Sequence, residues 1–250
     1  LQSLIAQPLF DLAVVGGGAT GLGVALDAAL RGFSVLLLES HDFAGGTSSR
    51  STKLLHGGVR YLAQGNIALV REALAERATV LRIAPHLAQP LRFVMPSYRW
   101  WQTPFYGIGL KLYDLMAGQA GLGRTDFLSR EQTLAALPGV NPLHLRGGVR
   151  YWDGQFDDAR LALALARTAE AAGAQVLNYA SVTAVRRQPG NAAVSTLDFT
   201  DTLTGTFHRA RARCVVNATG VWVDALRAHA GLTDGGPDQG APARMVSPSQ

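Results

Sequence analysis

The stretch DLAVVGGGATGLGVALDAALRGFSVLLLES, residues 11–40, decides the fold. Its apolar run 12–15 predicts a buried parallel strand, and residues 19–31 have helical periodicity. Residues 33–38 predict a second buried strand, which ends at Glu39. A strand, a glycine turn, a helix and another strand open a Rossmann-like α/β unit. The sequence therefore predicts a doubly wound domain of the kind that binds dinucleotides.

Three glycines in this stretch have the spacing of a dinucleotide site. Gly16 permits a tight turn, Gly18 lets the backbone approach a pyrophosphate, and Gly21 lets helix and strand pack closely. The helix start would present free N–H groups and its positive dipole end to the phosphates. Glu39, 23 residues after Gly16, can accept hydrogen bonds from ribose hydroxyls and would repel the 2′-phosphate of NADP.

A second apolar strand, VVNATG at 215–220, also ends in small residues. Together with the first glycine turn, it predicts that Ala218, Thr219 and Gly220 bring backbone to the cofactor again. An NAD domain more commonly continues with alternating strands and helices after its second strand. This chain instead inserts a polar segment and a long helical stretch, and then returns with a βαβ-like unit and an antiparallel layer. That interrupted layout favours FAD.

The polar segment TSSRSTKLLHGGVRYL, residues 47–62, follows the second strand directly and so begins at the carboxyl edge of the sheet, where ligands bind. Gly57 and Gly58 allow close backbone approach, and Arg60 carries a forked donor array suited to phosphate or carboxylate. The hydroxyls that can reach phosphate or flavin oxygens belong to Thr47, Ser48, Ser49 and Ser51.

Helices and short strands are predicted around these motifs. Asn66 caps an amphipathic helix that Pro85 stops, and a Pro- and aromatic-rich stretch follows at 90–118. The other predicted elements are a helix at 129–136, a strand and turn at 146–157, a helix at 157–174, a strand at 175–180, and antiparallel strands within 181–199 and 206–216.

We therefore predict a Rossmann-like FAD-binding domain of the two-domain flavoprotein type seen in glutathione reductase and D-amino-acid oxidase. A helical insertion and part of an antiparallel substrate-domain sheet accompany it. The predicted parts are a discontinuous FAD-binding domain at 10–65 and 146–225, a helical and aromatic insertion at 66–145 on the cap or substrate side, and the start of a cut-off substrate domain at 226–250.

Composition narrows the class of partner. The formal net charge is +5, and scattered arginines carry most of the positive charge, which argues against a nucleic-acid tail. The single cysteine excludes an intrachain disulfide and favours a reducing compartment, so we expect a cytoplasmic protein. Its place in the apolar run CVVNATG predicts a buried structural thiol. No run is apolar and long enough for a membrane helix, and no metal site is expected.

The quoted motifs, with ALAERATVLRIAPHL, YDLMAG and DDARLALALA, resemble the FAD-dependent, quinone-linked glycerol-3-phosphate dehydrogenases. The resemblance covers roughly residues 10–250, and two blocks, GTSSRSTKLLHGGVRYL and ALAERATVLRIAPHL, are specific to that family. Chains of the family run about twice as far, so the resemblance is to an amino-terminal half. It implies oxidation of sn-glycerol 3-phosphate to dihydroxyacetone phosphate, with hydride transfer from C2 to flavin N5 and electrons passed to quinone.

The resemblance also implies roles for individual residues. It places Arg60 and Tyr61 on the substrate side, with Arg60 on the phosphate. His56 is expected to contact the cofactor, and a role as the catalytic base is the less favoured interpretation. Val182 is expected to meet the adenine through its main chain. The residues expected to wrap the flavin are Thr47, Ser48, Ser51, Lys53, Leu54 and His56.

Several alternatives stay open. An amine or amino-acid oxidase of the same fold would share both glycine motifs, and a non-catalytic FAD-binding fragment would share everything but turnover. The aromatic and basic stretch 98–116 suits either an ordinary cap or a peripheral contact with the inner face of the cytoplasmic membrane, with the cap slightly favoured. The protein could also form a homodimer, and the sequence leaves its oligomeric state open.

Overall fold

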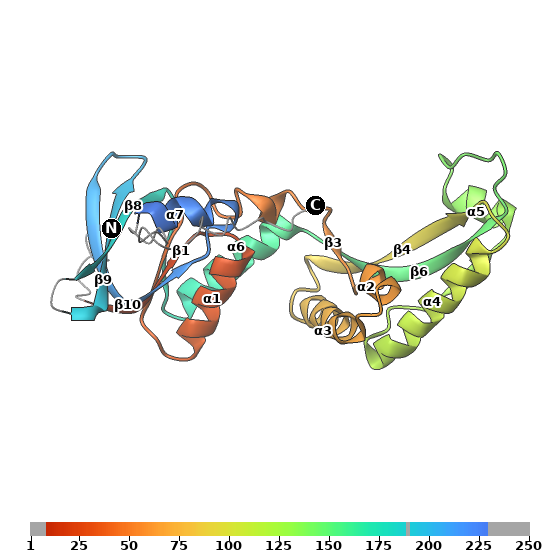
Figure 1. Cartoon of the computed structure of the whole chain (residues 1–250), viewed down its shortest axis with the longest axis horizontal. Coiled ribbons are helices and arrows are strands. Elements are labelled where there is room, and N and C mark those ends of the chain that lie inside the picture. The colour runs from red at the N-terminus through yellow and green to blue at the C-terminus, as the bar shows by residue number, and fades with distance from the viewer. Residues whose placement is uncertain (1–8, 189–190, 230–250) are drawn as a thin grey trace, which may run out of the picture. The chain divides into compact units, whose positions relative to one another are not determined.

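The computed structural model describes residues 9–188 and 191–229, which divide into two compact units (Figure 1). The first unit combines the described residues up to Ser51 with those from Asp158 onward, and the second is Thr52–Asp157. The divisions thus fall inside the predicted FAD-binding segments rather than at residues 65 and 145. Of the predicted substrate-domain start, 230–250 lies outside the described residues.

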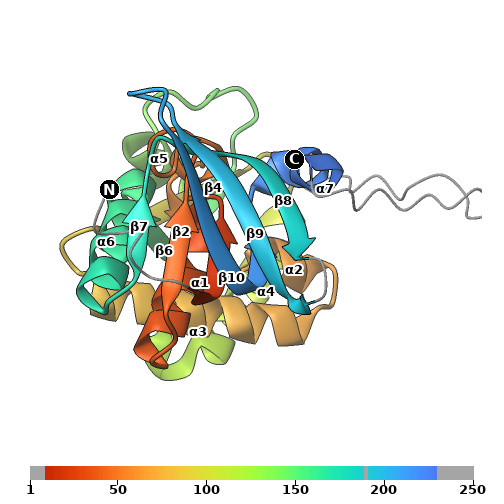
Figure 2. The same ribbon diagram turned by 90° about the vertical axis from the view of Figure 1, so that its left-hand side faces the viewer.

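One six-stranded sheet organises the first unit, in the order β7-β2-β1-β10-β9-β8. The strands β7, β2, β1 and β10 run parallel, whereas β10, β9 and β8 form an antiparallel meander (Figure 2). The apolar runs at 12–15 and 35–38 become central strands because both of their faces are buried. Their bounds are β1 Phe10–Val15, β2 Val35–Leu38, β7 Gln175–Leu177, β8 Ala180–Gln188, β9 Asn191–Asp201 and β10 Phe207–Asn217.

Two hydrophobic clusters hold this sheet. Helices α1 (Ala19–Leu30) and α6 (Asp158–Ala171) pack on one face through alanines and leucines. A second cluster joins β1 and β2 to β8, β9 and the short helix α7 (Val223–His229). The clusters take small and β-branched residues from β10 but leave Cys214 exposed, so the expectation of a buried thiol is wrong.

The second unit is an antiparallel sheet in the order β3-β6-β4, with β5 also paired to β6. Its strands are β3 Leu54–Leu55, β4 Ala88–Ser97, β5 Asp126–Leu128 and β6 Gly147–Phe156. Its helices are α2 Val59–Ala63, α3 Ile67–Ile83, α4 Gln102–Ala117 and α5 Arg130–Ala136. Single turns of 3₁₀ helix are η1 Thr47–Ser49 and η3 Gly220–Trp222 in the first unit and η2 Gly118–Ala120 in the second.

Local signals explain the helices of this unit. The side chain of Asn66 accepts the Leu69 N–H at 3.2 Å, which confirms the predicted cap of α3. Ser129 and Gln132 form a capping box at the start of α5. The predicted Pro-rich stretch contains a strand, β4, which the sequence reading missed. Proline is tolerated there because β4 is an edge strand of the path β3-β6-β4 and needs fewer N–H donors.

No helix within the described parts of the chain is both long and apolar enough to span a bilayer. The described residues also contain no cluster of three or more side chains that could hold a metal ion.

Candidate cofactor site

The ends of β1 and β10 meet at the first glycine of the turn. Gly16 has a φ of +113°, and a Cβ there would lie 2.4 Å from the carbonyl oxygen of Ala218. The Ala218 N–H donates to the Val15 carbonyl at 2.8 Å, and the Gly16 N–H donates to the Leu38 carbonyl at 2.9 Å. Three strand ends therefore converge here, and only glycine fits at Gly16.

The first turns of helix α1 pack very closely against this glycine turn. A Cβ on Gly21 would lie 1.9 Å from the Gly16 carbonyl oxygen, which confirms the predicted close packing of helix and strand. A Cβ on Gly18 would lie 3.1 Å from the hydroxyl of Ser48, which accepts the Ala19 N–H at 2.9 Å. Ser48 thus caps the helix end predicted to face phosphates, and its own proton stays available for an anion.

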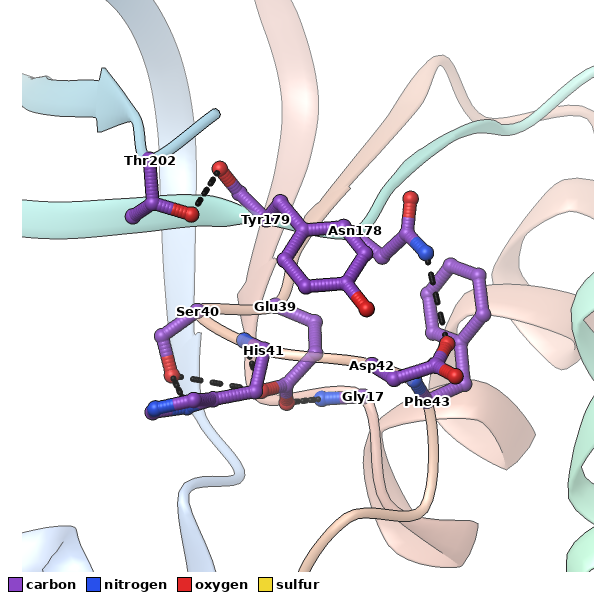
Figure 3. A network of polar contacts seen from close by, with 9 residues as sticks. All are labelled: Gly17, Glu39, Ser40, His41, Asp42, Phe43, Asn178, Tyr179 and Thr202. Carbon is purple, nitrogen blue, oxygen red and sulfur yellow. Dashed lines mark hydrogen bonds and ion pairs between the residues drawn. The ribbon is translucent and has the colours of Figure 1, made fainter. Parts of the chain in front are cut away.

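Glu39, which directly follows β2, is hydrogen-bonded to the glycine turn (Figure 3). Its Oε2 accepts the Gly17 N–H at 2.6 Å, and its Oε1 accepts the His41 N–H at 2.8 Å. The sequence predicted ribose contacts for this carboxylate but missed these two backbone bonds. The Ser40 hydroxyl also donates to Oε1, at 3.2 Å, so about one of the roughly four lone-pair positions of the carboxylate remains for a ribose hydroxyl.

The segment after Glu39 lies beside the start of β8. The Ala180 N–H donates to the Glu39 carbonyl at 2.7 Å, and the Tyr179 N–H donates to the His41 carbonyl at 3.0 Å. Val182 follows on β8, where it pairs with Phe199 just before a register shift. Its predicted main-chain contact with adenine therefore concerns a strand that starts next to Glu39, and it stays a prediction.

Ser51, whose contact with the cofactor stays a prediction, is bonded to helix α6 in this structure. Its hydroxyl donates to Asp158 Oδ2 at 2.7 Å, and its N–H donates to the same oxygen at 3.3 Å. Asp158 is buried in the first turn of α6 and also accepts the Ala159 N–H at 2.8 Å. The polar segment is thereby tied to α6, whereas the side chain of Thr47 is exposed.

The motif after β10 reaches the loop that carries Ser48. Thr219 is held by Asn217, whose side-chain oxygen accepts the Thr219 hydroxyl at 2.7 Å. Gly220 follows with a φ of +61°. The indole of Trp222 then packs on Gly46, where a Cβ would lie 3.2 Å from Cζ3. The sequence reading missed Trp222, although it stands two residues after the NATG motif.

The remaining predicted contacts belong to the second unit. Lys53 has a φ of +58°, and its carbonyl accepts the Phe156 N–H at 3.0 Å. Leu54 pairs with Gln155 across β3 and β6. The side chain of His56 is 59% exposed, and its Nδ1 lies 3.9 Å from Asp153 Oδ2.

Helix α2 carries the two predicted substrate residues. Tyr61 is 40% exposed on this helix. The backbone of Arg60 lies on α2, and its side chain lies outside what the structure describes.

The first unit has the features of a dinucleotide site: a parallel sheet, a glycine turn at its carboxyl edge, a helix N-terminus and an acid at the end of the second strand. The fold and site therefore define a nucleotide-dependent oxidoreductase domain. The chain belongs to the FAD dependent oxidoreductase family, whose model matches residues 11–246. Its cofactor is FAD, and the cradle of Gly16, Gly18 and Glu39 fits the adenosine and pyrophosphate of that group.

Within this family, the chain is similar to glycerol-3-phosphate dehydrogenases. The chain is 48% identical to the mitochondrial glycerol-3-phosphate dehydrogenase of Macaca fascicularis over 229 residues, which cover 87% of this chain and 32% of that protein. The crystal structure of glycerol-3-phosphate dehydrogenase from Bacillus halodurans, complexed with FAD, is 36% identical with a TM-score of 0.68, over 91% of this chain and 37% of that one. The chain thus spans about a third of the length of these relatives.

A structure with another substrate shares the fold alone. Glycine oxidase from Geobacillus kaustophilus is 24% identical with a TM-score of 0.59, over 90% of this chain and 59% of that chain.

Proposed function

We propose that this chain is the FAD-binding part of an enzyme that oxidises sn-glycerol 3-phosphate to dihydroxyacetone phosphate and passes the electrons to a quinone. One observation carries the proposal: 48% identity, over 87% of the chain, to an enzyme named for glycerol 3-phosphate. The segment 47–62, with its hydroxyls, paired glycines and Arg60, supports it, because this block is the part of the sequence that resembles the glycerol-3-phosphate dehydrogenases specifically.

The chain's own residues bind, orient and move protons in this mechanism. The turn Gly16–Gly18 and the start of α1 bind the pyrophosphate, and Glu39 binds the ribose while it holds the turn. When bound, FAD supplies the hydride acceptor. Arg60 binds the substrate phosphate as a permanent cation.

The substrate hydroxyl must release a proton as C2 loses a hydride. His56 is the candidate acceptor on this chain, because its ring is exposed and lies near the buried carboxylate of Asp153. A contact between His56 and the cofactor remains the favoured interpretation, and the role of base is the second.

The visible spectrum of the FAD-loaded chain tests this function. Anaerobic sn-glycerol 3-phosphate should bleach the flavin absorbance, and glycine should leave it unchanged. Bleaching by glycine instead would favour the amino-acid oxidase. A yellow chain that neither compound bleaches would favour the non-catalytic FAD-binding fragment, and Arg60→Ala would then show no difference from the unaltered chain.

The outer face of α4 supports a peripheral membrane contact, where a lipid-dissolved quinone would be accessible. Leu110, Tyr113 and Ala117 of this helix are buried. Five apolar side chains three or four positions apart are 40–78% exposed; they are Trp101, Phe105, Ile108, Leu112 and Leu115. We propose that this stripe rests on the cytoplasmic face of the membrane.

Liposome flotation tests the membrane contact. The unaltered chain should float with vesicles of phosphatidylcholine and phosphatidylglycerol, and Phe105→Glu with Ile108→Glu should stay at the bottom. Leu163→Glu is the matched control, since it adds a charge at a leucine on α6 that is 46% exposed. If the chain instead sedimented as a dimer, and Phe105→Glu dissociated that dimer, the stripe would be an interface with a second copy of the chain.

A further inference from the structure

A buried polar network occupies the centre of the second unit. It joins Arg77 of α3, Tyr113 of α4 and Asp153 of β6, which are 2%, 1% and 2% exposed. Arg77 Nη1 donates to Asp153 Oδ1 and to the Tyr113 hydroxyl, both at 3.0 Å, and its Nη2 donates to the Ala120 carbonyl at 3.0 Å. A charged pair this deep has lost its hydration, so it must be held by such bonds.

The network ends on the polar segment. The Gly57 N–H donates to both oxygens of Asp153, at 3.0 and 3.3 Å. A Cβ on Gly57 would lie 1.7 Å from the Tyr113 hydroxyl oxygen and 2.7 Å from Leu74 Cδ2. Only glycine can therefore approach the network this closely, and its amide is the group that the carboxylate holds.

The residues on either side of Gly57 are those expected to act on the substrate. His56 precedes it and lies 3.9 Å from Asp153. Gly58 follows with a φ of +84° and is the N-cap of α2, the helix that carries Arg60 and Tyr61. The hydrogen bonds to the Gly57 amide therefore fix the position of the His56 imidazole and the point at which α2 begins.

Stability alone does not account for this arrangement. Replacing a buried ion pair by apolar residues of similar volume is often neutral or stabilising. Burial, and then the charge of Asp153, raises the pKa of Tyr113, so its phenol stays neutral beside the guanidinium. Arg77 Nε has no hydrogen-bond partner among the described residues, which adds a desolvation cost.

We propose that Asp153, paired with Arg77, is a positioning residue that fixes the Gly57–Gly58 turn and, through it, His56 and the start of α2 for the substrate. This rests on the proposed function for the identity of the substrate. The placement of the turn itself does not depend on it.

Two double variants of the full chain separate positioning from stability. Arg77→Met with Asp153→Asn removes both charges but keeps an amide oxygen that can accept the Gly57 N–H. Arg77→Met with Asp153→Leu removes both charges and that acceptor. Neither leaves an unpaired buried charge, so we expect both to fold.

Hydrogen exchange of the Gly57 amide is the first measurement. The leucine variant should exchange at least about tenfold faster than the asparagine variant, since a buried N–H loses its partner. The second measurement is binding of sn-glycerol 3-phosphate to the FAD-loaded chain, which the leucine variant should weaken about tenfold while the asparagine variant retains it.

Equal exchange in the two variants would overturn the proposal, whether both match the unaltered chain or both are faster, because the carboxylate would then act through charge or packing alone. A change that follows the melting temperature rather than the Gly57 acceptor would overturn it too. Lack of sn-glycerol 3-phosphate binding by the unaltered chain would count against the proposed function. Hydrogen exchange of the Gly57 amide would still show whether Asp153 positions the turn.

Discussion

Replacing Gly21 by alanine tests the contact between α1 and the glycine turn. The new Cβ would lie 1.9 Å from the Gly16 carbonyl oxygen, whereas carbon and oxygen ordinarily approach to about 3.3 Å. That oxygen belongs to the backbone of Gly16, whose N–H is bonded to the Leu38 carbonyl, so it moves aside at a higher cost than a flexible side chain would. Overpacking of this kind costs about 3 kcal/mol, and alanine's better helix propensity returns about 1 kcal/mol. The variant should lose about 2 kcal/mol of its free energy of unfolding.

Gly23 provides the matched control on the same helix. A Cβ at this position meets nothing within 4 Å, so Gly23→Ala should stabilise the chain by about 1 kcal/mol through helix propensity alone. Urea unfolding followed by circular dichroism measures both changes. Quenching of flavin fluorescence measures FAD binding, which Gly21→Ala should weaken because the displaced Gly16 carbonyl shifts the Gly17 amide.

The reasoning would be refuted if Gly21→Ala were as stable as Gly23→Ala. It would also be refuted if Gly21→Ala bound FAD as tightly as the unaltered chain while losing the expected stability, since the turn would then be structural and not part of the cofactor cradle.

Three further outcomes follow from the first unit. Glu39→Ala should weaken FAD binding about ten- to a hundredfold in a flavin fluorescence titration, because hydrogen bonds to a charged group contribute about 1.5–3 kcal/mol, and Glu39→Gln should lose less. Gly46→Ala should weaken FAD binding because its Cβ would meet Trp222 at 3.2 Å, and Trp222→Leu should relieve most of that loss in a double-mutant cycle. The pKa of Asp198 is lowered, chiefly by the hydrogen bond from Arg209, so this carboxylate contributes stability above about pH 4 that is lost as the pH falls through the lowered pKa. Asp198→Asn should therefore be less stable at neutral pH, and in urea unfolding it should converge with the unaltered chain once the pH falls below that lowered pKa.

Each of these outcomes has a contrary result. Equal FAD binding by Glu39→Ala and the unaltered chain would remove the carboxylate from the cofactor site. Additive effects of Gly46→Ala and Trp222→Leu would mean that the two residues do not act through their contact. A constant stability difference for Asp198→Asn from neutral to acid pH would show that its charge contributes nothing.

Much of the first unit could be predicted because its signals are local. Two apolar runs and three spaced glycines specify β1, the turn, α1 and β2, and the packing of Gly21 follows from the same pattern. The cap of α3 is also local, since Asn66 meets an amide three residues away. In each case the interacting groups are near in sequence or belong to one periodic motif.

Other features depend on partners that sequence patterns do not reveal. Strand β4 was not predicted from its sequence, which contains two prolines, and its position at the edge of the sheet makes those prolines acceptable. The hydrogen bond from the Ser51 hydroxyl to Asp158 joins residues 107 positions apart, and no local pattern indicates that pairing. Cys214 lies in an apolar run, yet its exposure depends on which side chains the two clusters enclose.

The sequence by itself indicated the family and its FAD cofactor through the resemblance of its motifs. Glycine spacing and strand periodicity reflect backbone requirements directly, so they also predicted the edge of the sheet where the cofactor should bind. Only the tertiary structure decided that Glu39 holds the Gly17 amide, that Trp222 leans on Gly46, and that Asp153 holds the Gly57 amide. These contacts join segments 22 to 176 positions apart, and their existence depends on distances that only packing sets.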